Sequence, residues 1–598
     1  MTGCRMAGVE RVMPEETSKS SALFGREAVT PPGWVRTARP LSVAVLGWAR
    51  LSEREREGSG YNLVASELAA GLAMSGHRVS YLRSGADYAL RPGMHIRRNG
   101  RYRGVECAHL VNSPNAAPGL FNFRNMSREM RCKKQTRLVM RWLDSVGADV
   151  VHIHSLEGFS LDVIEAIKAS GRGVVVTPHN YWFVCPQVDL LHKGTHVCMD
   201  YAGGRACEGC MTPASTWKTR WRRKITQMLF RRTGPMLGGW IAGVLFEPWP
   251  ILRSREARLR MQLGEEERLD PELARGMSID PREEHSGELV HDKPVPEDIT
   301  IVEIGRSELD TNERFLGASH HLTVLNGYGQ RRWAGVQALR QVDRLTPPSV
   351  FCGEVHVRMG VEPERVECVR LGLPHLDRLA RRSKRSAFYD VRPWDAATAR
   401  GPLRLAFFGT VRHQKGIETL VRAITLLPKA ERQRCQFLIR AALGDWLHRR
   451  RLSRFPEVSF LGGYDMAQLM SSGGEYDVGL LPHIWFENSP LVMLEFLSSG
   501  KFVVASRLGG PPEWVVEPGG AGSEGNGGLG NGLLVPGGQP EALAGAIGRL
   551  VRGEVTIPSP REVHAVSLLR DYPSYVAACE GVYQRVLDAR RSRGDTQA

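Results

Sequence analysis

One stretch in the C-terminal part of the chain predicts a strand, a loop and a helix in direct succession. The apolar run 478–481 is typical of a buried strand, and the helix is expected to begin with Ser489 as its N-cap and Pro490 as its first residue. Glu487 lies in the loop, and Glu495 lies about one and a half turns inside the helix. Because the free N–H groups at a helix N-terminus suit a phosphate, the unit predicts a site for a phosphate-bearing ligand.

Motifs on both sides of this unit stand in a recognisable order. They are FFGT at 407–410, KGI at 415–417, GGPPE at 509–513, GLLV at 532–535 and PEAL at 540–543. Together with Glu487 and Glu495, which have seven residues between them, they resemble the group 1 glycosyltransferases of family 4, whose retaining members carry an E-x7-E motif. Two glutamates at this spacing are common by chance, so the ordered motifs around them carry the resemblance.

The resemblance implies the α/β GT-B fold, in which two Rossmann-like doubly wound domains face each other across a cleft. It also implies transfer of a sugar from a UDP- or GDP-sugar to a glycan or lipid-linked acceptor, with retention of anomeric configuration and no divalent metal required. A role in polysaccharide or glycolipid biosynthesis is a family-level expectation. Two alternatives stay open: another GT-B enzyme, such as a sugar-nucleotide epimerase or phosphorylase, and a degenerate, non-catalytic GT-B binding protein.

The resemblance assigns two cations to the donor diphosphate. Charge builds up on this leaving group during transfer, and fixed cations lower the barrier. Lys415 and Arg412 are the expected cations, beside the glycine turn at Gly409. Thr410 stands where the family often has arginine, so Arg412 is a neighbouring substitute, whereas Lys415 matches directly. Phe496, in place of the usual alanine, is a second departure.

The two glutamates and their neighbours are expected to hold the rest of the donor. Glu495 would accept hydrogen bonds from the ribose hydroxyls, as an acidic residue does in dinucleotide-binding folds. Glu487 would be the catalytic carboxylate beside the donor sugar, and Asn488 and Ser489 would contact the same sugar. Because both glutamates and Lys415 are intact, the sequence favours an enzyme over the degenerate alternative.

The N-terminal part predicts a second nucleotide-binding type of unit. Its pattern opens a doubly wound domain, with a strand at 41–47, a polar loop at 51–62, a helix at 63–74 and a second strand ending at 82. Gly58 and Gly60 match the family's glycine-bearing loop, which faces the donor diphosphate. Glycines of a flexible surface loop are the alternative interpretation.

Histidines mark the ends of two later strands. The strand 173–177 leads to His179, which matches the family's T-x-H position near the transferred sugar and is the second catalytic candidate. His152 and His154 lie two residues apart on a strand and therefore share one face. A histidine on a strand is more often structural than catalytic, and these two are expected to be structural.

Four of the eleven cysteines cluster in one segment: Cys185, Cys198, Cys207 and Cys210. The last two form a C-x2-C knuckle of the zinc-ligand type, and four thiols could make a closed tetrahedral site. Some relatives whose segment begins H-x-x-W-x-x-C-P carry such cysteines. A structural zinc that fixes a loop beside the cleft is one interpretation, and four ordinary reduced cysteines are the other.

The net charge of +16 favours an anionic partner. Residues 216–232 interleave seven basic residues with aromatic and aliphatic ones at near-helical spacing, which predicts an amphipathic helix on an anionic membrane surface. A nucleic acid would suit the same pattern, but no nucleic-acid motif accompanies it, so none is expected as a partner. A solvated basic helix packed on its domain is the remaining alternative.

With 598 residues, the chain exceeds one ordinary core. The expected parts are a disordered tail 1–38, an N-terminal acceptor domain 39–375 with an acidic, partly disordered insertion 247–312, a linker 376–402, a C-terminal donor domain 403–573, and a helix with tail 574–598 that returns to the N-terminal domain. The longest apolar candidate, 235–246, is too short to span a bilayer, and no secretory signal is recognisable. A cytoplasmic protein, peripheral on the inner face of the plasma membrane, is expected.

Overall fold

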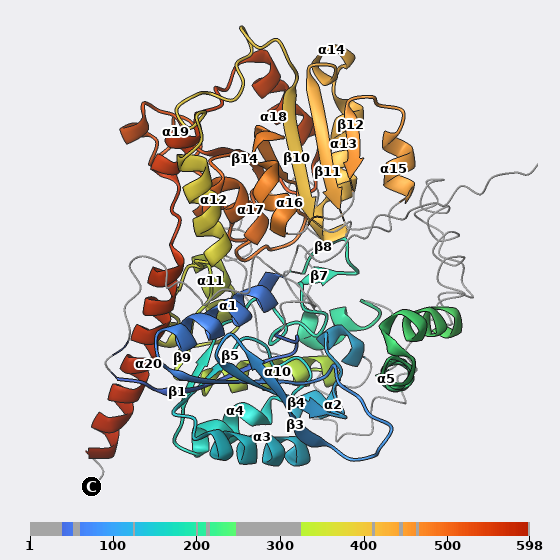
Figure 1. Ribbon diagram of the computed structural model, residues 1–598, viewed down its shortest axis with the longest axis vertical. Helices are drawn as coiled ribbons and strands as arrows, with labels where there is room; N and C mark the ends of the chain where they lie inside the picture. Colours follow the sequence, from blue (N-terminus) through green and yellow to red (C-terminus); the bar gives the residue numbers. More distant parts are fainter. Residues whose placement is uncertain are drawn as a thin grey trace, which may run out of the picture.

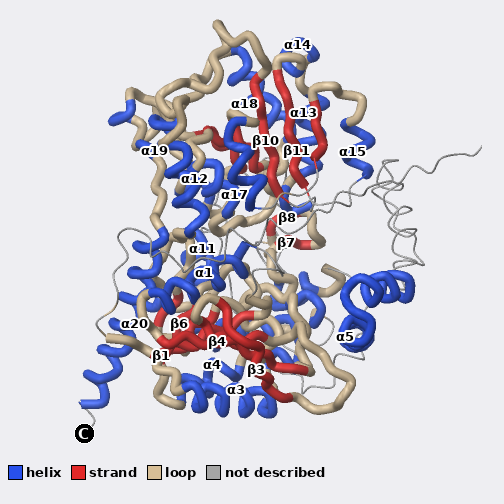
Figure 2. The backbone as a smooth tube through the Cα atoms, in the orientation of Figure 1, coloured by secondary structure: helices blue, strands red, loops and turns tan. Residues whose placement is uncertain are grey.

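The computed structural model describes residues 37, 39–51, 60–123, 126–198, 201–210, 216–246, 324–409, 413–441, 446–461, 464 and 466–595. These residues form two α/β domains, which lie one above the other in Figure 1, and Figure 2 shows a separate sheet in each. The predicted insertion 247–312 lies outside the described residues, as do Gly58, Arg412 and, apart from Thr37, the predicted tail 1–38.

The N-terminal domain is built on a seven-stranded sheet in the order β3-β4-β2-β1-β5-β6-β9. The strands are β1 (Ser42–Gly47), β2 (Arg78–Arg83), β3 (His95–Tyr102), β4 (Val105–Val111), β5 (Val150–Ile153), β6 (Gly173–Val176) and β9 (Arg344–Leu345). Only β3 and β4 pair antiparallel, as an edge hairpin. The parallel strands follow the doubly wound order 3-2-1-4-5-6, which reverses between β1 and β5.

Helices cover both faces of this sheet. Successive residues of β1 point to opposite faces. Val43 and Val45 pack in one core cluster with α1 (Gly60–Met74) and the C-terminal helix α20 (Tyr572–Asp595), whereas Ala44 and Leu46 pack in another with α3 (Lys133–Val146) and α4 (Asp162–Ala169). The helices are α1 (Gly60–Met74), α2 (Ser127–Met130), α3 (Lys133–Val146), α4 (Asp162–Ala169), α5 (Thr216–Phe246), α10 (Gly327–Arg340), α11 (Val350–Arg358) and α12 (Pro374–Lys384). A small hairpin, β7 (Leu191–His192) with β8 (His196–Val197), lies beside them.

The C-terminal domain has a six-stranded, fully parallel sheet in the order β12-β11-β10-β13-β14-β15. The strands are β10 (Leu403–Gly409), β11 (Cys435–Ala441), β12 (Val458–Leu461), β13 (Val478–Leu481), β14 (Phe502–Ser506) and β15 (Gly532–Val535). This is again the 3-2-1-4-5-6 order, and it reverses between β10 and β13. The predicted GT-B arrangement of two doubly wound domains is confirmed.

The helices of this domain are α13 (Ile417–Leu426), α14 (Lys429–Arg432), α15 (Trp446–Leu452), α16 (Met466–Ser471), α17 (Leu491–Ser498), α18 (Pro540–Arg552) and α19 (Pro560–Val566). α13 and α18 pack together on one face of the sheet, and α17 lies on the other, against α12 and α19. Among the described residues, no helix combines the length and the hydropathy that a bilayer crossing requires.

The C-terminal helix α20 (Tyr572–Asp595) leaves the upper domain and runs down the side of the lower one (Figure 1). The hydroxyl of Tyr572 donates to the backbone oxygen of Glu67 on α1 (2.6 Å), and the hydroxyl of Tyr583 lies 2.6 Å from His152 Nδ1 on β5. Apolar residues of α20, α12 and α17 belong to one core cluster with β1 and α1. The two domains therefore share a core on this side.

Two sequence-based boundaries differ from the structure. α17 begins at Leu491 with Pro490 as its N-cap, so the prediction of Ser489 as the N-cap is wrong. The predicted linker 376–402 overlaps α12, in which Leu376 and Leu379 are buried in the shared core. This connection therefore starts as a packed helix, because its apolar residues recur at helical spacing.

Replacing Tyr583 by phenylalanine tests the attachment of α20. The hydroxyl is a partner of the buried His152, whose other ring nitrogen meets Thr177 Oγ1 at 2.8 Å. Leaving a buried polar atom unpaired costs about 1–3 kcal/mol, so Tyr583→Phe should unfold at a lower urea concentration than the wild type. Tyr389→Phe is the control, since that hydroxyl meets His564 at 3.2 Å in a more exposed place and should cost less. Equal urea midpoints for the wild type and Tyr583→Phe would contradict the expectation.

Candidate active site

Two loops meet where the strand order of the C-terminal sheet reverses. In open α/β sheets, ligands bind outside the carboxyl ends of the strands at such a point. The loop after β10 carries Lys415, the loop after β13 carries Glu487, and the Lys415 ammonium forms an ion pair with the Glu487 carboxylate. Lys415 Nζ also lies 5.4 Å from the ring centre of Trp485. Two residues that are 72 positions apart, both predicted from the sequence, are thus brought together.

Lys415 decides the charge of Glu487. Glu487 is buried, and burial alone would raise the pKa of its carboxyl. The Lys415 ammonium outweighs this effect and holds the pKa below the ordinary value of 4.5. The site therefore contains a carboxylate that is ionised at neutral pH beside a fixed cation.

Two glycines allow the loops of this site to approach each other. Gly416, with φ of 73°, lies where a Cβ atom would overlap the backbone oxygen of Pro482. Gly509, with φ of 75°, lies where a Cβ atom would overlap the backbone oxygen of Glu487. Positive φ and close backbone contact both require glycine, which explains the glycines of the KG and GGPPE motifs in physical terms.

Glu495 lies inside α17 and is also buried. His375 Nε2 lies 3.1 Å from one carboxylate oxygen, and the hydroxyl of Tyr464 donates to the other at 3.3 Å. His375 comes from α12, the helix that connects the domains. Because each carboxylate oxygen can accept a second hydrogen bond, Glu495 retains capacity for ligand hydroxyls.

Asn488 and Ser489 follow Glu487 in the same loop. Asn488 is only 5% exposed, yet among the described residues neither its amide nitrogen nor its amide oxygen has a hydrogen-bond partner. The hydroxyl of Ser489 is likewise buried and unpaired. Buried polar groups in proteins are nearly always paired, so three open polar atoms in one loop indicate a place for a polar ligand or water. The sequence analysis expects both residues to contact the donor sugar, and this role stays a prediction.

In the N-terminal domain, His179 lies just beyond the end of β6. Its Nε2 lies 2.8 Å from Nδ1 of His154, and the two rings stack with centres 5.1 Å apart. Burial lowers the pKa of His179 to about 3, and it lowers the pKa of His154 well below 6.5. Both rings are therefore neutral at physiological pH and act as hydrogen-bonding groups. The sequence predicted His179 as a site residue but did not predict its contact with His154.

The glycine candidates of the first loop differ in outcome. Gly60 is the first residue of α1, and a Cβ atom there would lie 2.9 Å from Leu491 Cδ1 on α17. The N-terminus of α1 thus lies against the start of α17 in the other domain. For Gly58, as for Arg412, the structure gives no placement, and the predicted roles stay predictions.

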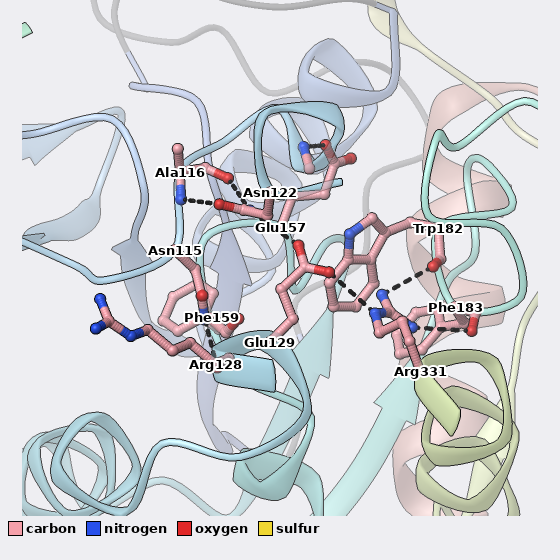
Figure 3. Close-up of polar contacts among 11 residues, drawn as sticks. Asn115, Ala116, Asn122, Arg128, Glu129, Glu157, Phe159, Trp182, Phe183 and Arg331 are labelled. Carbon is pink, nitrogen blue, oxygen red and sulfur yellow. Dashed lines mark hydrogen bonds and ion pairs between the residues drawn. The ribbon is translucent and has the colours of Figure 1, made fainter. Parts of the chain in front are cut away.

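A buried polar network lies beneath the loop that follows His179 (Figure 3). Arg331 Nε donates to Glu129 at 2.9 Å, and its Nη atoms donate to the backbone oxygens of Trp182 (3.0 Å) and Phe183 (3.2 Å). Glu129 also accepts a hydrogen bond from Asn122 at 2.9 Å. Because Arg331 and Glu129 are almost fully buried, the network fixes the loop 180–185 rigidly against α10 and α2.

A second carboxylate strengthens this support. Glu157 accepts hydrogen bonds from the backbone nitrogen of Gly119 (2.5 Å) and from the side chain of Asn180 (3.0 Å). Asn180 in turn accepts from the backbone nitrogen of Trp182 at 3.0 Å. The residues on both sides of Tyr181 are therefore held in place by hydrogen bonds.

Three contacts join the domains around this site. The rings of Phe351 on α11 and Phe486 have centres 4.9 Å apart. Glu513 accepts hydrogen bonds from the first backbone nitrogens of α11, at 2.9 and 2.8 Å. Gln414 donates to Asp189 at 3.0 Å. The loops at the carboxyl ends of both sheets therefore face each other. The loop that carries Glu487 lies against α11 through the Phe351–Phe486 contact.

The four clustered cysteines lie near one another without forming a disulfide. The pKa of the Cys207 thiol is raised well above 9. Burial is the largest cause, and the neighbouring thiols of Cys198, Cys185 and Cys210 raise it further. Within the described residues, however, no group of three or more His, Cys, Asp or Glu side chains is arranged to hold a metal ion. The zinc site stays a prediction, which metal analysis of the purified protein can decide.

The sequence analysis did not identify His375, Tyr181 or Arg331 as functional or supporting residues. His375 was assigned to an acceptor-domain segment, and Arg331 lay in a stretch without a motif. Their partners are 120 and 202 residues away for His375 and Arg331, so no local pattern could reveal them.

Arg331→Met tests the network of Figure 3. Removing one member of a buried ion pair leaves Glu129 charged and unpaired, which typically costs about 3–5 kcal/mol. We expect a large fall in the urea midpoint of the variant. The double variant Glu129→Gln/Arg331→Met removes both charges and should recover a large part of the loss. A single variant as stable as the wild type would show that the network does not hold the loop.

Comparisons with known proteins agree with the two-domain architecture. A family model described as "Glycosyltransferase Family 4" matches residues 58–234, and one described as "Glycosyl transferases group 1" matches residues 402–553. The first match includes His179 and the cysteine cluster, and the second includes Lys415, Glu487 and Glu495. No curated protein matched the chain.

Solved structures with a similar course of the chain are distant in sequence. Sucrose-phosphate synthase from Thermosynechococcus elongatus is 14% identical, with a TM-score of 0.48 and coverage of 92% of this chain and 100% of that one. The UDP-forming α,α-trehalose-phosphate synthase from Burkholderia xenovorans, in complex with glucose-6-phosphate, is 12% identical (TM-score 0.48; 92% and 100%). HepE from Anabaena, in complex with UDP and glucose, is 12% identical (TM-score 0.45; 91% and 100%).

These structural similarities are too weak to support an argument about function. The strand orders and the two family models are independent of them. One glycosyltransferase model is matched in each of the two doubly wound domains, so the chain carries glycosyltransferase domains on a GT-B fold.

Proposed function

We propose that the protein transfers a sugar from a nucleotide sugar, a UDP- or GDP-sugar, to a glycan or lipid-linked acceptor, with retention of anomeric configuration. The observation that supports this most is the Lys415–Glu487 ion pair at the reversal of strand order in the C-terminal sheet. A cation beside a buried carboxylate at this position suits a diphosphate next to a sugar.

Lys415 would bind the diphosphate, together with Arg412. As the bond between sugar and phosphate breaks, negative charge develops on the leaving phosphate, and a fixed ammonium stabilises it. We propose that these cations, rather than a divalent metal, balance this charge. Glu487, released from Lys415 in part, would lie by the donor sugar and stabilise positive charge at the anomeric carbon.

The remaining candidates would orient the donor. Glu495 would accept hydrogen bonds from the ribose hydroxyls, with His375 and Tyr464 holding its carboxylate in place. Asn488 and Ser489 would use their open hydrogen-bonding atoms for the sugar. His179, neutral and bonded to His154, would offer a hydrogen bond from the N-terminal side.

A thermal-shift panel of UDP-, GDP- and ADP-sugars, with and without EDTA, tests the donor site. We expect one nucleotide class to raise the melting temperature equally in both conditions. Because a ligand stabilises only the state that binds it, Glu495→Ala should lose most of this shift. If no nucleotide sugar shifts the wild type, the degenerate binding protein becomes the better interpretation. A shift that disappears with EDTA would contradict the metal-free mechanism.

The N-terminal domain also offers a surface for the membrane on which a lipid-linked acceptor would lie. α5 contains seven basic residues and no acidic residue. Arg223 fastens it to the domain by donating to the backbone oxygens of Gly85 (2.6 Å) and Ala117 (2.7 Å). Trp217 is 65% exposed and Trp221 is 44% exposed. Basic residues with exposed tryptophans suit the interface of an anionic membrane.

Vesicle flotation tests this surface. We expect the protein to float with vesicles that contain phosphatidylglycerol, to float less with pure phosphatidylcholine, and to be released by salt, because the attraction is electrostatic. Trp217→Ala/Trp221→Ala should weaken flotation. Phe388→Ala, which removes a side chain 70% exposed elsewhere, is the control and should have no effect. Flotation that is indifferent to anionic lipid would contradict the proposal.

A further inference from the structure

Tyr181 has a hydroxyl group that the fold buries without giving it a partner. Tyr181 is 0% exposed, and its Oη makes no hydrogen bond within the part of the chain that the structure describes. A buried hydroxyl that is unpaired destabilises the folded state, whereas phenylalanine in the same place would carry no such cost. Hydrogen bonding within the described fold therefore does not explain why this position holds a tyrosine and not a phenylalanine.

The loop that carries Tyr181 is held from both sides. Asn180 donates to Glu157 at 3.0 Å, and Arg331 donates to the backbone oxygen of Trp182 at 3.0 Å, as Figure 3 shows for the second contact. The position of the tyrosine ring is thus fixed by groups that are themselves fully engaged. Such support is what a binding group needs in order to meet a ligand without reorganisation.

Tyr181 packs against α11, where its ring stacks on His356 with centres 6.1 Å apart. The core cluster that contains Tyr181 extends to Phe486 and Leu508 of the C-terminal domain. Burial raises the pKa of its hydroxyl well above 10, and the charge of nearby Glu487 contributes to the rise. The hydroxyl therefore stays protonated and can donate a hydrogen bond.

Asn488 presents the matching feature from the other domain. It is the next residue after Glu487. The backbone there packs closely against Gly510, where a Cβ atom would overlap the Asn488 backbone oxygen. Both atoms of its side-chain amide are buried and unpaired. The amide therefore offers one unused acceptor and one unused donor group.

We propose that the Tyr181 hydroxyl and the Asn488 amide bind hydroxyl groups of the transferred sugar from opposite domains, which makes Tyr181 a residue that determines sugar specificity. The inference rests on the proposed function, and it adds a contact from the N-terminal domain that neither the E-x7-E motif nor the T-x-H position contains.

The donor and acceptor inventory favours a sugar over a phosphate at these atoms. A sugar hydroxyl both donates and accepts, so it can satisfy the Asn488 oxygen as well as its nitrogen. An ionised phosphate oxygen only accepts, and it would leave the Asn488 oxygen buried and unpaired. The diphosphate is more suitably placed beside Lys415, which only donates.

Tyr181→Phe tests the proposal by removing one oxygen atom. The binding of the nucleoside diphosphate alone and of its nucleotide sugar would be compared by calorimetry, using UDP with UDP-glucose and UDP-galactose, and GDP with GDP-mannose. We expect the dissociation constant of the nucleotide sugar to rise about tenfold, as for the loss of one hydrogen bond. The constant for the nucleoside diphosphate should stay unchanged, and the variant should be no less stable than the wild type.

Tyr583→Phe is the matched control, because its hydroxyl already has His152 as a partner in the fold. It should lower stability and leave both dissociation constants unchanged. The proposal is overturned if Tyr181→Phe leaves sugar binding unchanged, if it weakens diphosphate and nucleotide sugar equally, or if it lowers the melting temperature as Tyr583→Phe does. If the wild type binds none of the nucleotide sugars, the proposed function itself fails, and the inference fails with it.

Discussion

The ion pair between Lys415 and Glu487 is the interaction on which the rest of the site depends. A buried carboxylate is unfavourable unless a cation compensates it, and Lys415 supplies that cation across the reversal of strand order. The pair holds together the loops after β10 and β13, which a backbone hydrogen bond from Ile484 to Gln414 (3.1 Å) also joins. Gly416 and Gly509 are needed because these loops pack backbone to backbone. A diphosphate that enters the site would compete for the Lys415 ammonium, so binding and the release of Glu487 are coupled.

The second glutamate connects the site to the domain junction. Glu495 is held by His375 of α12, and α12 shares a core with α17 and α20. A rotation of the domains that moved α12 against α17 would therefore change the position of the Glu495 carboxylate. Glu513, which caps α11 from the other domain, provides a similar connection on the opposite side. The proposed nucleotide site and the domain junction thus share the same hydrogen-bonded groups.

A feature could be predicted from the sequence where the residues that form it are close together in the chain. The strands, the glycine turns and the Glu487–Glu495 spacing are local patterns, and the doubly wound fold could be predicted from them together with the family resemblance. The predicted start of α17 is wrong by one residue. Serine is a common N-cap residue, but the hydroxyl of Ser489 caps no backbone nitrogen of α17. His375 and Arg331 act through partners that are distant in sequence, and only the folded chain brings them together.

The contrast between two sets of buried polar groups carries the functional argument furthest. In the network of Figure 3, Glu129 and Arg331 are buried, and each makes at least two hydrogen bonds. Tyr181, in the loop that this network supports, and Asn488, in the other domain, are also buried but have no hydrogen-bond partner for their side chains among the described residues. The Glu129–Arg331 network shows that buried polar groups in this fold can be fully hydrogen-bonded. If stability alone were selected, apolar residues would be favoured at the positions of Tyr181 and Asn488. Open polar atoms on a rigid support are the pattern expected of a binding site whose ligand completes the hydrogen bonding.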